Sequence, residues 1–349
     1  MELWISTDEN ETNIIKLVSA ITWSGENGRC GRTLAFSVLS SPTDESVPVA
    51  DIPLGAGVRL SIDDGTYFDG YVFTRQKLTE SSTIEITCYD RGIYLKRNEL
   101  TRNYSNSAAE DVTVQLCGEF GVEVGSIAKT NVRLSRNFVG TSIYRIIQTM
   151  YTLASRETGE AYQIRFNGAA LDVVVKAVSE ETLVIKGGSN LIDAAVTESV
   201  EQMITQVAIY GEDDNLVGVV KSEERTKLYG QMQKYIKQVK DEDPKKAAQK
   251  LLDDNGINQK ITVNNLGNLE CVTGNAVVIE EPYTGLYGLF WIDADTHTWK
   301  NGLYFNRLVL NFRRMMDEQE AGSLPTAKST GKTGSGNQNY WEYLYTPGG

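Results

Sequence analysis

The sequence contains a single histidine, His297, and its four cysteines never form a Cys-x-x-Cys pair. A serine or cysteine hydrolase needs a base beside its nucleophile, so one histidine leaves little room for that chemistry. The scattered cysteines, Cys30, Cys88, Cys117 and Cys271, are typical of reduced structural thiols rather than disulfides or zinc ligands. We therefore expect no enzyme, with no catalytic residue, no metal and no cofactor.

Long apolar runs and an excess of positive charge are missing as well. No stretch approaches the ~18 apolar residues of a membrane helix. The N-terminus lacks the basic start and apolar core of a signal peptide. We therefore expect no membrane anchor, and synthesis and assembly in the cytoplasm. With 34 Lys and Arg against 46 Asp and Glu, the net charge is −12. That balance argues against specific nucleic-acid binding, which depends on clustered cations.

The sequence is rich in short β-branched runs separated by Gly and Asp turns. Within residues 1–100, the runs Leu34–Leu39, Val58–Ile62 and Ile84–Tyr89 predict the strands of a small barrel or sandwich. The pattern changes over 101–186, where helical spacing and an Asn167-Gly168 hairpin predict a small α/β domain.

Strand patterns return over residues 187–317 and predict a second barrel. A helical insert is expected at about 224–255, because Asp243-Pro244 is a favourable helix start. Residues 318–349 have the Gly, Ser and Thr composition of a linker and end in an aromatic segment. The predicted fold class is β-rich α+β, with two tube-type β-barrels separated by a small α/β domain, a helical insert in the second barrel region and a flexible C-terminal tail.

The two β-rich regions resemble one another. Residues 57–64 and 274–281 align at an offset of 217, and Gly70 then matches Gly288 after one insertion. Two unrelated hairpins can also look this similar. If the unit is duplicated, a trimer of this chain presents six similar modules in a ring.

Four ordered motifs carry a resemblance to a known family. They are Trp23-Ser24-Gly25 with Arg32 and Leu34, then 68–72 (FDGYV), 89–95 (YDRGIYL), and 291–299 (WIDADTHTW) before Asn301-Gly302. Together they resemble contractile-tail baseplate hub proteins of the PBSX-type (XkdQ/YqbQ) family. That family is related to late control protein D and to the hub domain of type VI secretion spikes.

The resemblance implies a structural baseplate hub of a contractile phage tail or phage-tail-like bacteriocin. Such a hub is a homotrimer with pseudo-sixfold symmetry that joins a hexameric tail tube protein to a central spike protein, beside other baseplate components. It would leave the cell with the particle on lysis. The open alternative is a carbohydrate- or cell-wall-binding β-protein, which would also be acidic, β-rich and aromatic.

Asp293, Asp295 and His297 alternate along one predicted strand and share a face. Three ligands on one straight strand spread over ~13 Å, too far for a single ion. We therefore expect this row to be a polar outward face, with Thr296 and Thr298 opposite.

The C-terminal segment carries four closely spaced aromatic residues that are candidates for docking on a partner: Tyr340, Trp341, Tyr343 and Tyr345. Aromatic side chains are enriched at binding anchors, and a tether raises their local concentration. The alternative, a tail that packs on its own subunit, stays open.

Overall fold

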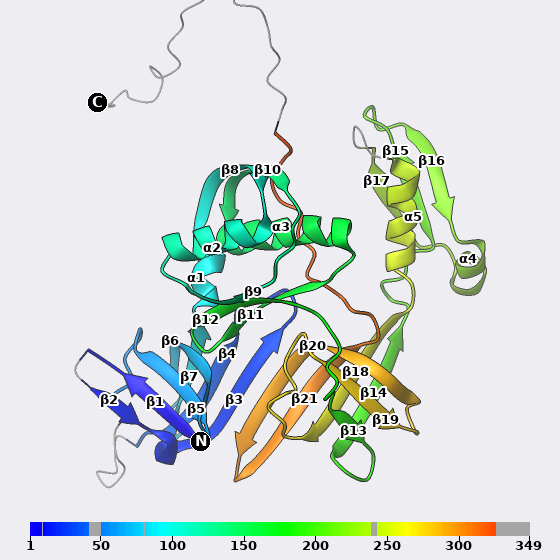
Figure 1. The fold of residues 1–349 in the computed structure, drawn as a ribbon. Coiled ribbons are helices and arrows are strands. Elements are labelled where there is room, and N and C mark those ends of the chain that lie inside the picture. Colours follow the sequence, from blue (N-terminus) through cyan, green and yellow to red (C-terminus); the bar gives the residue numbers. More distant parts are fainter. Residues whose placement is uncertain (9, 42–49, 80, 239–242, 326–349) are drawn as a thin grey trace, which may run out of the picture.

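The computed structural model describes residues 1–8, 10–41, 50–79, 81–238 and 243–325. Two β-sheet halves lie side by side below an α/β layer, and a small α/β unit projects beyond the second half (Figure 1). No helix within those residues is long and apolar enough to cross a membrane. The chain is mostly β with few helices, which confirms the β-rich α+β class.

The first half is an antiparallel sheet whose alternate residues face a core. Its β4 buries Leu34, Phe36 and Val38, at most 2% exposed, while the residues between them face outward. Its elements are β1 (Glu2–Ser6), β2 (Glu11–Asn13), η1 (Ile15–Leu17), β3 (Val18–Glu26), β4 (Thr33–Leu39), β5 (Gly57–Ile62), β6 (Gly65–Lys77) and β7 (Thr83–Asp90).

The second half is built in the same way around its own core. There β19 buries Val277 and Ile279 against neighbouring strands. Its elements are β13 (Val184–Lys186), β14 (Leu191–Ser199), β18 (Asn258–Leu266), β19 (Ala276–Glu281), β20 (Leu286–Lys300) and β21 (Leu303–Asn311).

The two halves have the same topology. The order β3-β4-β7-β6-β5 matches β14-β18-β21-β20-β19, and every neighbouring pair is antiparallel in both. Two of the bulges coincide as well. The register shift at 18/20 in β3 recurs at 191/193 in β14, and that at 72/74 in β6 recurs at 292/294 in β20. Since bulges are specific local features, their coincidence establishes a duplicated unit.

The hydrogen bonds correct the sequence alignment by two residues. Gly55 N–H donates to the Val72 carbonyl, and Gly274 N–H donates to the Ile292 carbonyl, both at 2.9 Å. Both glycines have a left-handed backbone, with φ of 85° and 94°. The equivalent of Gly274 is therefore Gly55 and not Gly57, so the offset is 219 (274 − 55) rather than 217.

The expected match between Gly70 and Gly288 is also wrong. Gly70 lies opposite Val58, whereas Gly288 lies opposite Ile279. In the corrected alignment the equivalent of Ile279 is Leu60, whose partner is Phe68. The glycines were conspicuous in the sequence but occupy different places in the two hairpins.

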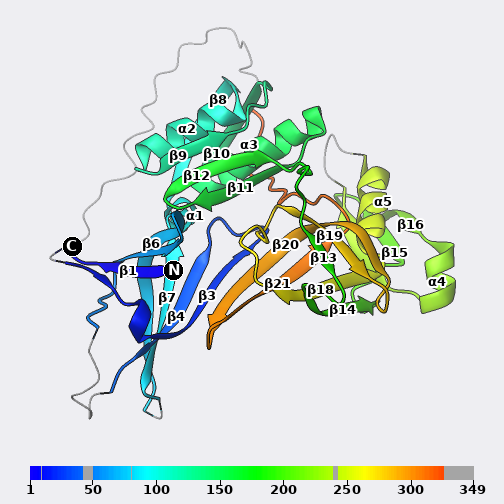
Figure 2. The ribbon, with the colours of Figure 1, turned by 60° about the horizontal axis from the view of Figure 1, so that its bottom comes forward.

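Neither half closes into a barrel within the described chain. The long strand β20 pairs with β19 through residues 286–291 and with β3 through residues 294–300. The two halves thereby join into one open sheet of thirteen strands (Figure 2). Two closed barrels were expected, but strand patterns in a sequence carry no information on closure.

The α/β layer covers one end of both halves and has a large apolar core around α3. It contains α1 (Gly92–Arg97), β8 (Glu99–Ser107), α2 (Ala109–Glu119), β9 (Glu123–Ile127), β10 (Leu134–Ser142), α3 (Ile143–Thr158), β11 (Tyr162–Asn167) and β12 (Ala170–Val175). Ser142 caps α3 by accepting a hydrogen bond from Arg145 N–H, and Gly159 ends it with φ of 75°. The Asn167-Gly168 hairpin forms as predicted between β11 and β12.

The insert between β14 and β18 is not all helical. It contains β15 (Gln206–Tyr210), β16 (Leu216–Lys221), α4 (Glu223–Tyr229), β17 (Gln233–Lys237) and α5 (Pro244–Asp254). The expected helix at 224–255 is therefore interrupted by β17, which pairs in parallel with β15. Asp243 caps α5 as its sequence predicted. Ala248 and Leu252 of α5 pack on this small sheet and give the insert its own core.

Residues 317–323, here called the C-terminal strap, contradict the predicted linker. The strap lies along α3 and β10, where Asn137 and Ser323 exchange two backbone hydrogen bonds of 2.8 Å. Thr149 Oγ1 and Thr152 Oγ1 accept from Ala321 N–H and Gln319 N–H. Its polar composition resembled a linker because its partners are backbone and hydroxyl groups. Tyr340, Trp341, Tyr343 and Tyr345 lie outside the described residues.

Candidate assembly interface

The contact between the two halves, here called the internal seam, is the antiparallel pairing of β20 with β3. It runs from Ala294 opposite Glu26 to Lys300 opposite Ala20. Figure 2 shows these strands continuing one sheet into the other. The seam thus uses main-chain hydrogen bonds, the interaction that joins strands within a single sheet.

A buried ion pair locks the internal seam on its core side. Arg32 Nη1 donates to Asp295 Oδ1 at 3.1 Å, and its Nη2 contacts Asp295 Oδ2. The carboxylate also accepts from Thr273 N–H and Thr273 Oγ1, both at 2.6 Å. The Arg32 guanidinium lies 3.8 Å from the centre of the Trp23 ring. Charge, hydrogen bonds and cation–π contact therefore satisfy a carboxylate that is fully buried.

Burial alone would raise the pKa of Asp295, but the Arg32 guanidinium and His297 outweigh it and hold that pKa below its ordinary value. Asp295 is consequently ionised at neutral pH. Gly25 lies opposite Asp295 in the seam, and the position has no room for a side chain. A Cβ there would lie 2.5 Å from Arg32 Nη1.

The loop that carries Arg32 is anchored by Asp90. Its carboxylate accepts Arg32 N–H at 2.7 Å and Gly92 N–H at 2.9 Å, and burial raises the pKa of Asp90 to about 7. Gly31 permits this approach, because a Cβ there would lie 1.9 Å from the Asp90 carboxylate. Motifs that are far apart in the sequence, around Trp23, Asp90 and Asp295, therefore meet at one junction.

His297 is buried in this junction, which corrects the expected outward-facing row. Asn306 Nδ2 donates to His297 Nδ1 at 2.8 Å, since the Asn306 oxygen is already occupied by Asn268 N–H. Nδ1 is therefore unprotonated, and Nε2–H faces the Cys271 carbonyl at 3.1 Å. Asp295 and His297 share a face as predicted, but the register shift at 292/294 interrupts the alternation at Asp293, and the sequence did not show that the core lies on the side of Asp295 and His297.

We expect the contribution of His297 to the stability of the protein to fall as the pH drops below about 6.5, the ordinary pKa of histidine. Burial lowers the pKa of His297, with Asp295 opposing. The unfolded state therefore binds a proton first, and stability that is present above the unfolded pKa is lost toward and through the lower folded pKa. Urea midpoints from pH 8 to 5 should decrease more steeply in the wild type than in His297→Gln; parallel slopes would contradict this assignment.

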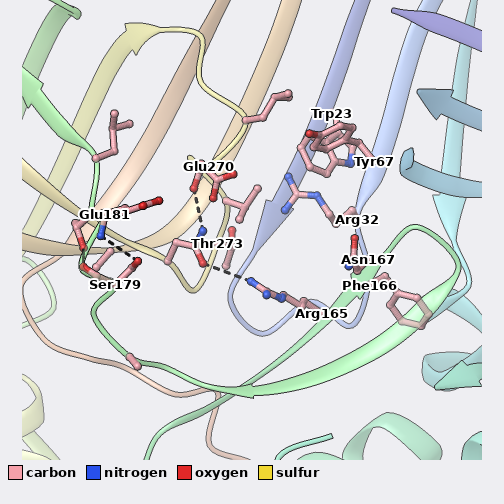
Figure 3. Close-up of a pocket in the computed structure, with 17 residues that line it drawn as sticks. Trp23, Arg32, Tyr67, Arg165, Phe166, Asn167, Ser179, Glu181, Glu270 and Thr273 are labelled. Atoms are coloured by element: carbon pink, nitrogen blue, oxygen red, sulfur yellow. Dashed lines mark hydrogen bonds between the residues drawn. The ribbon is translucent and has the colours of Figure 1, made fainter. Parts of the chain in front are cut away.

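A cavity of about 530 Å³ lies where the two halves meet the β11–β12 hairpin. Figure 3 shows Trp23 and Arg32 on one side of it and Arg165 on another. Ser179, one of the lining residues, accepts a hydrogen bond from Glu181 N–H at its Oγ. The chain's one histidine is not among the lining residues. The cavity lies between three structural units, and polar side chains from each of them line it.

Of the strand edges that the open sheet leaves unpaired in the described chain, two are equivalent to the strands of the internal seam. One is β14, the last strand of the second half, which has one sheet partner, β18. The other is the end of β6, where residues 74–77 pair with β7 on one side only. All four of these residues are exposed. In the duplicated unit these edges correspond to β3 and to the end of β20, the two strands that form the internal seam.

The comparisons with known proteins agree with this geometry. A model of the YQBQ-like family matches residues 21–311. The phage-like element PBSX protein XkdQ of Bacillus subtilis (strain 168) is 22% identical over 311 residues, covering 86% of this chain and 93% of that protein. An uncharacterised Bacillus subtilis protein, YqbQ, is 22% identical over 305 residues, with coverages of 84% and 92%.

Solved structures share the fold at low sequence identity. The 43 kDa tail protein of prophage MuSo2 from Shewanella oneidensis has a TM-score of 0.66 and 12% identity, covering 89% of this chain and 98% of that one. A tail protein from Neisseria meningitidis MC58 has a TM-score of 0.61 and 13% identity, with coverages of 88% and 95%. The chain therefore belongs to the YQBQ-like family and has the fold of solved phage tail proteins.

Proposed function

We propose that this chain is a structural baseplate hub, a homotrimer that joins a hexameric tail tube to a central spike. The observation that supports it is the repeated half together with the internal seam. One chain presents two equivalent modules already joined edge to edge, and neither β14 nor residues 74–77 of β6 have a second strand partner among the described residues. Repeating the seam between chains converts three chains into a ring of six modules, which suits a threefold spike and a sixfold tube.

The relatives of the chain are consistent with this role. The relative XkdQ belongs by name to a phage-like element, and the Escherichia coli c3393 protein, with a TM-score of 0.51 over 88% of this chain, is a component of the type VI secretion system. The proposed activity is mechanical and non-enzymatic, with no metal or cofactor. Assembly in the cytoplasm and release with the particle on lysis belong to the same proposal.

Native mass spectrometry of the purified full-length chain tests this function. We expect a trimer as the main species, and threefold rings with six similar modules in electron micrographs. A monomer or an even-numbered oligomer at micromolar concentration would contradict the hub. A monomer retained on cell-wall polysaccharide would instead favour the carbohydrate-binding alternative.

We further propose that the aromatic segment containing Tyr340, Trp341, Tyr343 and Tyr345 docks on an adjacent baseplate or spike component. Chains that end after Pro325 should still form trimers but should fail to complete particles. Normal particles from such chains would leave the segment without this role.

A further inference from the structure

The residues that would pair between neighbouring chains can be assigned from the duplication. We propose that residues 74–77 of β6 form an antiparallel ladder with residues 196–199 of β14 in a second copy of this chain, in one defined register. This deepens the hub proposal and rests on it. The partner surface is named strand by strand rather than as a general trimer contact.

The bulges fix the correspondence between the two seams. The shift after Ile292 in β20 matches the shift after Val72 in β6, so Asp295 corresponds to Arg75. The shift after Leu191 in β14 matches the shift after Val18 in β3, so Glu198 corresponds to Gly25. Each later residue follows in order, because no further register shift separates them in β20, β3 or β14.

Transferring the internal register then gives four cross-strand partners. The internal seam places Asp295 opposite Gly25 and Thr296 opposite Ser24. The seam between chains therefore places the following residues opposite one another: Thr74 and Ser199, Arg75 and Glu198, Gln76 and Thr197, Lys77 and Val196.

The side chains of these pairs are chemically complementary, although side-chain chemistry was not used to choose the register. Arg75 and Glu198, both exposed in the single chain, meet directly on the core side of the sheet. Lys77 lies diagonally from Glu198 on the same face, within reach of a long side chain. In the internal seam the acid is on β20 and Arg32 comes from the β3 side, so the second seam repeats the ion pair with its charges exchanged. On the other face, Gln76 meets Thr197 as Thr296 meets Ser24.

Both edges also have the composition of strands that pair selectively with another strand. Except for Val196 their residues are polar, and except for Val196 and Ser199 they are exposed. A charged edge residue disfavours indiscriminate pairing while allowing pairing with an edge of opposite charge. Val196 faces the core of the second half, so Lys77 would cover it with its aliphatic stem.

Disulfide cross-linking tests the register in the full-length chain. Residues directly opposite in an antiparallel pair lie within the range that a disulfide can bridge. We expect Gln76→Cys with Thr197→Cys to give covalent dimers and trimers, and no covalent species larger than three chains. Gln76→Cys with Val196→Cys is the off-register control, since its side chains point to opposite faces. Thr296→Cys with Ser24→Cys should link within one chain and reports on oxidation. The native cysteines in the described residues are all buried.

A charge exchange provides the second measurement. Arg75→Glu and Glu198→Arg should each raise the concentration at half-assembly of the trimer by roughly tenfold or more, and the double variant should restore it. The two proposals fail separately. A native trimer that links at 296/24 but not at 76/197, or in which charge exchange restores nothing, overturns the register and leaves the hub. A chain that forms no trimer at all overturns the hub.

Discussion

Arg32→Ala should lower the free energy of unfolding by about 3–5 kcal/mol, the usual cost of leaving a buried charge without its partner. Asp295 is fully buried and ionised, and Arg32 is its only cationic side-chain partner among the described residues, because the neighbouring His297 is neutral at pH 7. The change also removes the cation–π contact with Trp23. Guanidinium or urea unfolding of the two chains at pH 7 measures the difference.

Two matched variants separate charge from general damage. Arg29→Ala breaks an ion pair with Glu26 whose side chains are 63% and 52% exposed, so its effect should stay below about 1 kcal/mol. Arg32→Ala combined with Asp295→Ala removes both charges and should be less harmful than the two single losses added together. The loss in Arg32→Ala should also shrink at acid pH, because an unpaired buried carboxyl has a raised pKa and is protonated there. Equal effects of Arg29→Ala and Arg32→Ala would refute the importance of the buried pair.

The sequence predicted the parts of this junction better than their arrangement. Trp23, Arg32 and the 291–299 segment were all singled out as motifs, and the structure brings them into contact. Their meeting could not be predicted, because β3 and β20 are separated by more than two hundred residues and pair only after both halves fold. The face that His297 occupies depended on that pairing.

The duplication was detectable but could not be aligned correctly from residue identities. Glycines dominated the comparison, yet Gly70 and Gly288 serve different local needs, while the equivalent pair is Gly55 and Gly274. Hydrogen-bond register and bulges decide which residues of two sheets are equivalent, and neither can be recognised from identical residues in two short segments. The parallel strand β17 was missed for a related reason: its partner β15 lies beyond α4.

Ending the chain after Met316 should destabilise the α/β layer by on the order of 3 kcal/mol relative to a chain that ends after Pro325. The difference between the two chains is the C-terminal strap with Leu324 and Pro325. Net hydrogen-bond contributions are ~1 kcal/mol each, offset in part by the entropy of ordering the strap. The bonds that would be lost join α3 and β10 to the strap: Tyr144 Oη to Asp317, Gln148 Nε2 to the Asp317 carbonyl, Gln319 N–H to Thr152, Ala321 N–H to Thr149, Arg136 Nε to the Ala321 carbonyl, and the Asn137–Ser323 pair.

Gly322→Val should reproduce part of this loss in the full-length chain. Gly322 has φ of 73°, and a Cβ there would lie 2.3 Å from the Asn137 carbonyl oxygen, so a branched side chain cannot remain docked. The strap would then separate from β10 at its end and expose Ala321, which is 8% exposed in the intact protein. Thermal unfolding and the rate of limited proteolysis within residues 101–186 measure both effects. If the chain ending after Met316 unfolds at the same temperature as the chain ending after Pro325, the strap contributes nothing to the stability of the layer. The interpretation of residues 318–325 as a linker would then be restored.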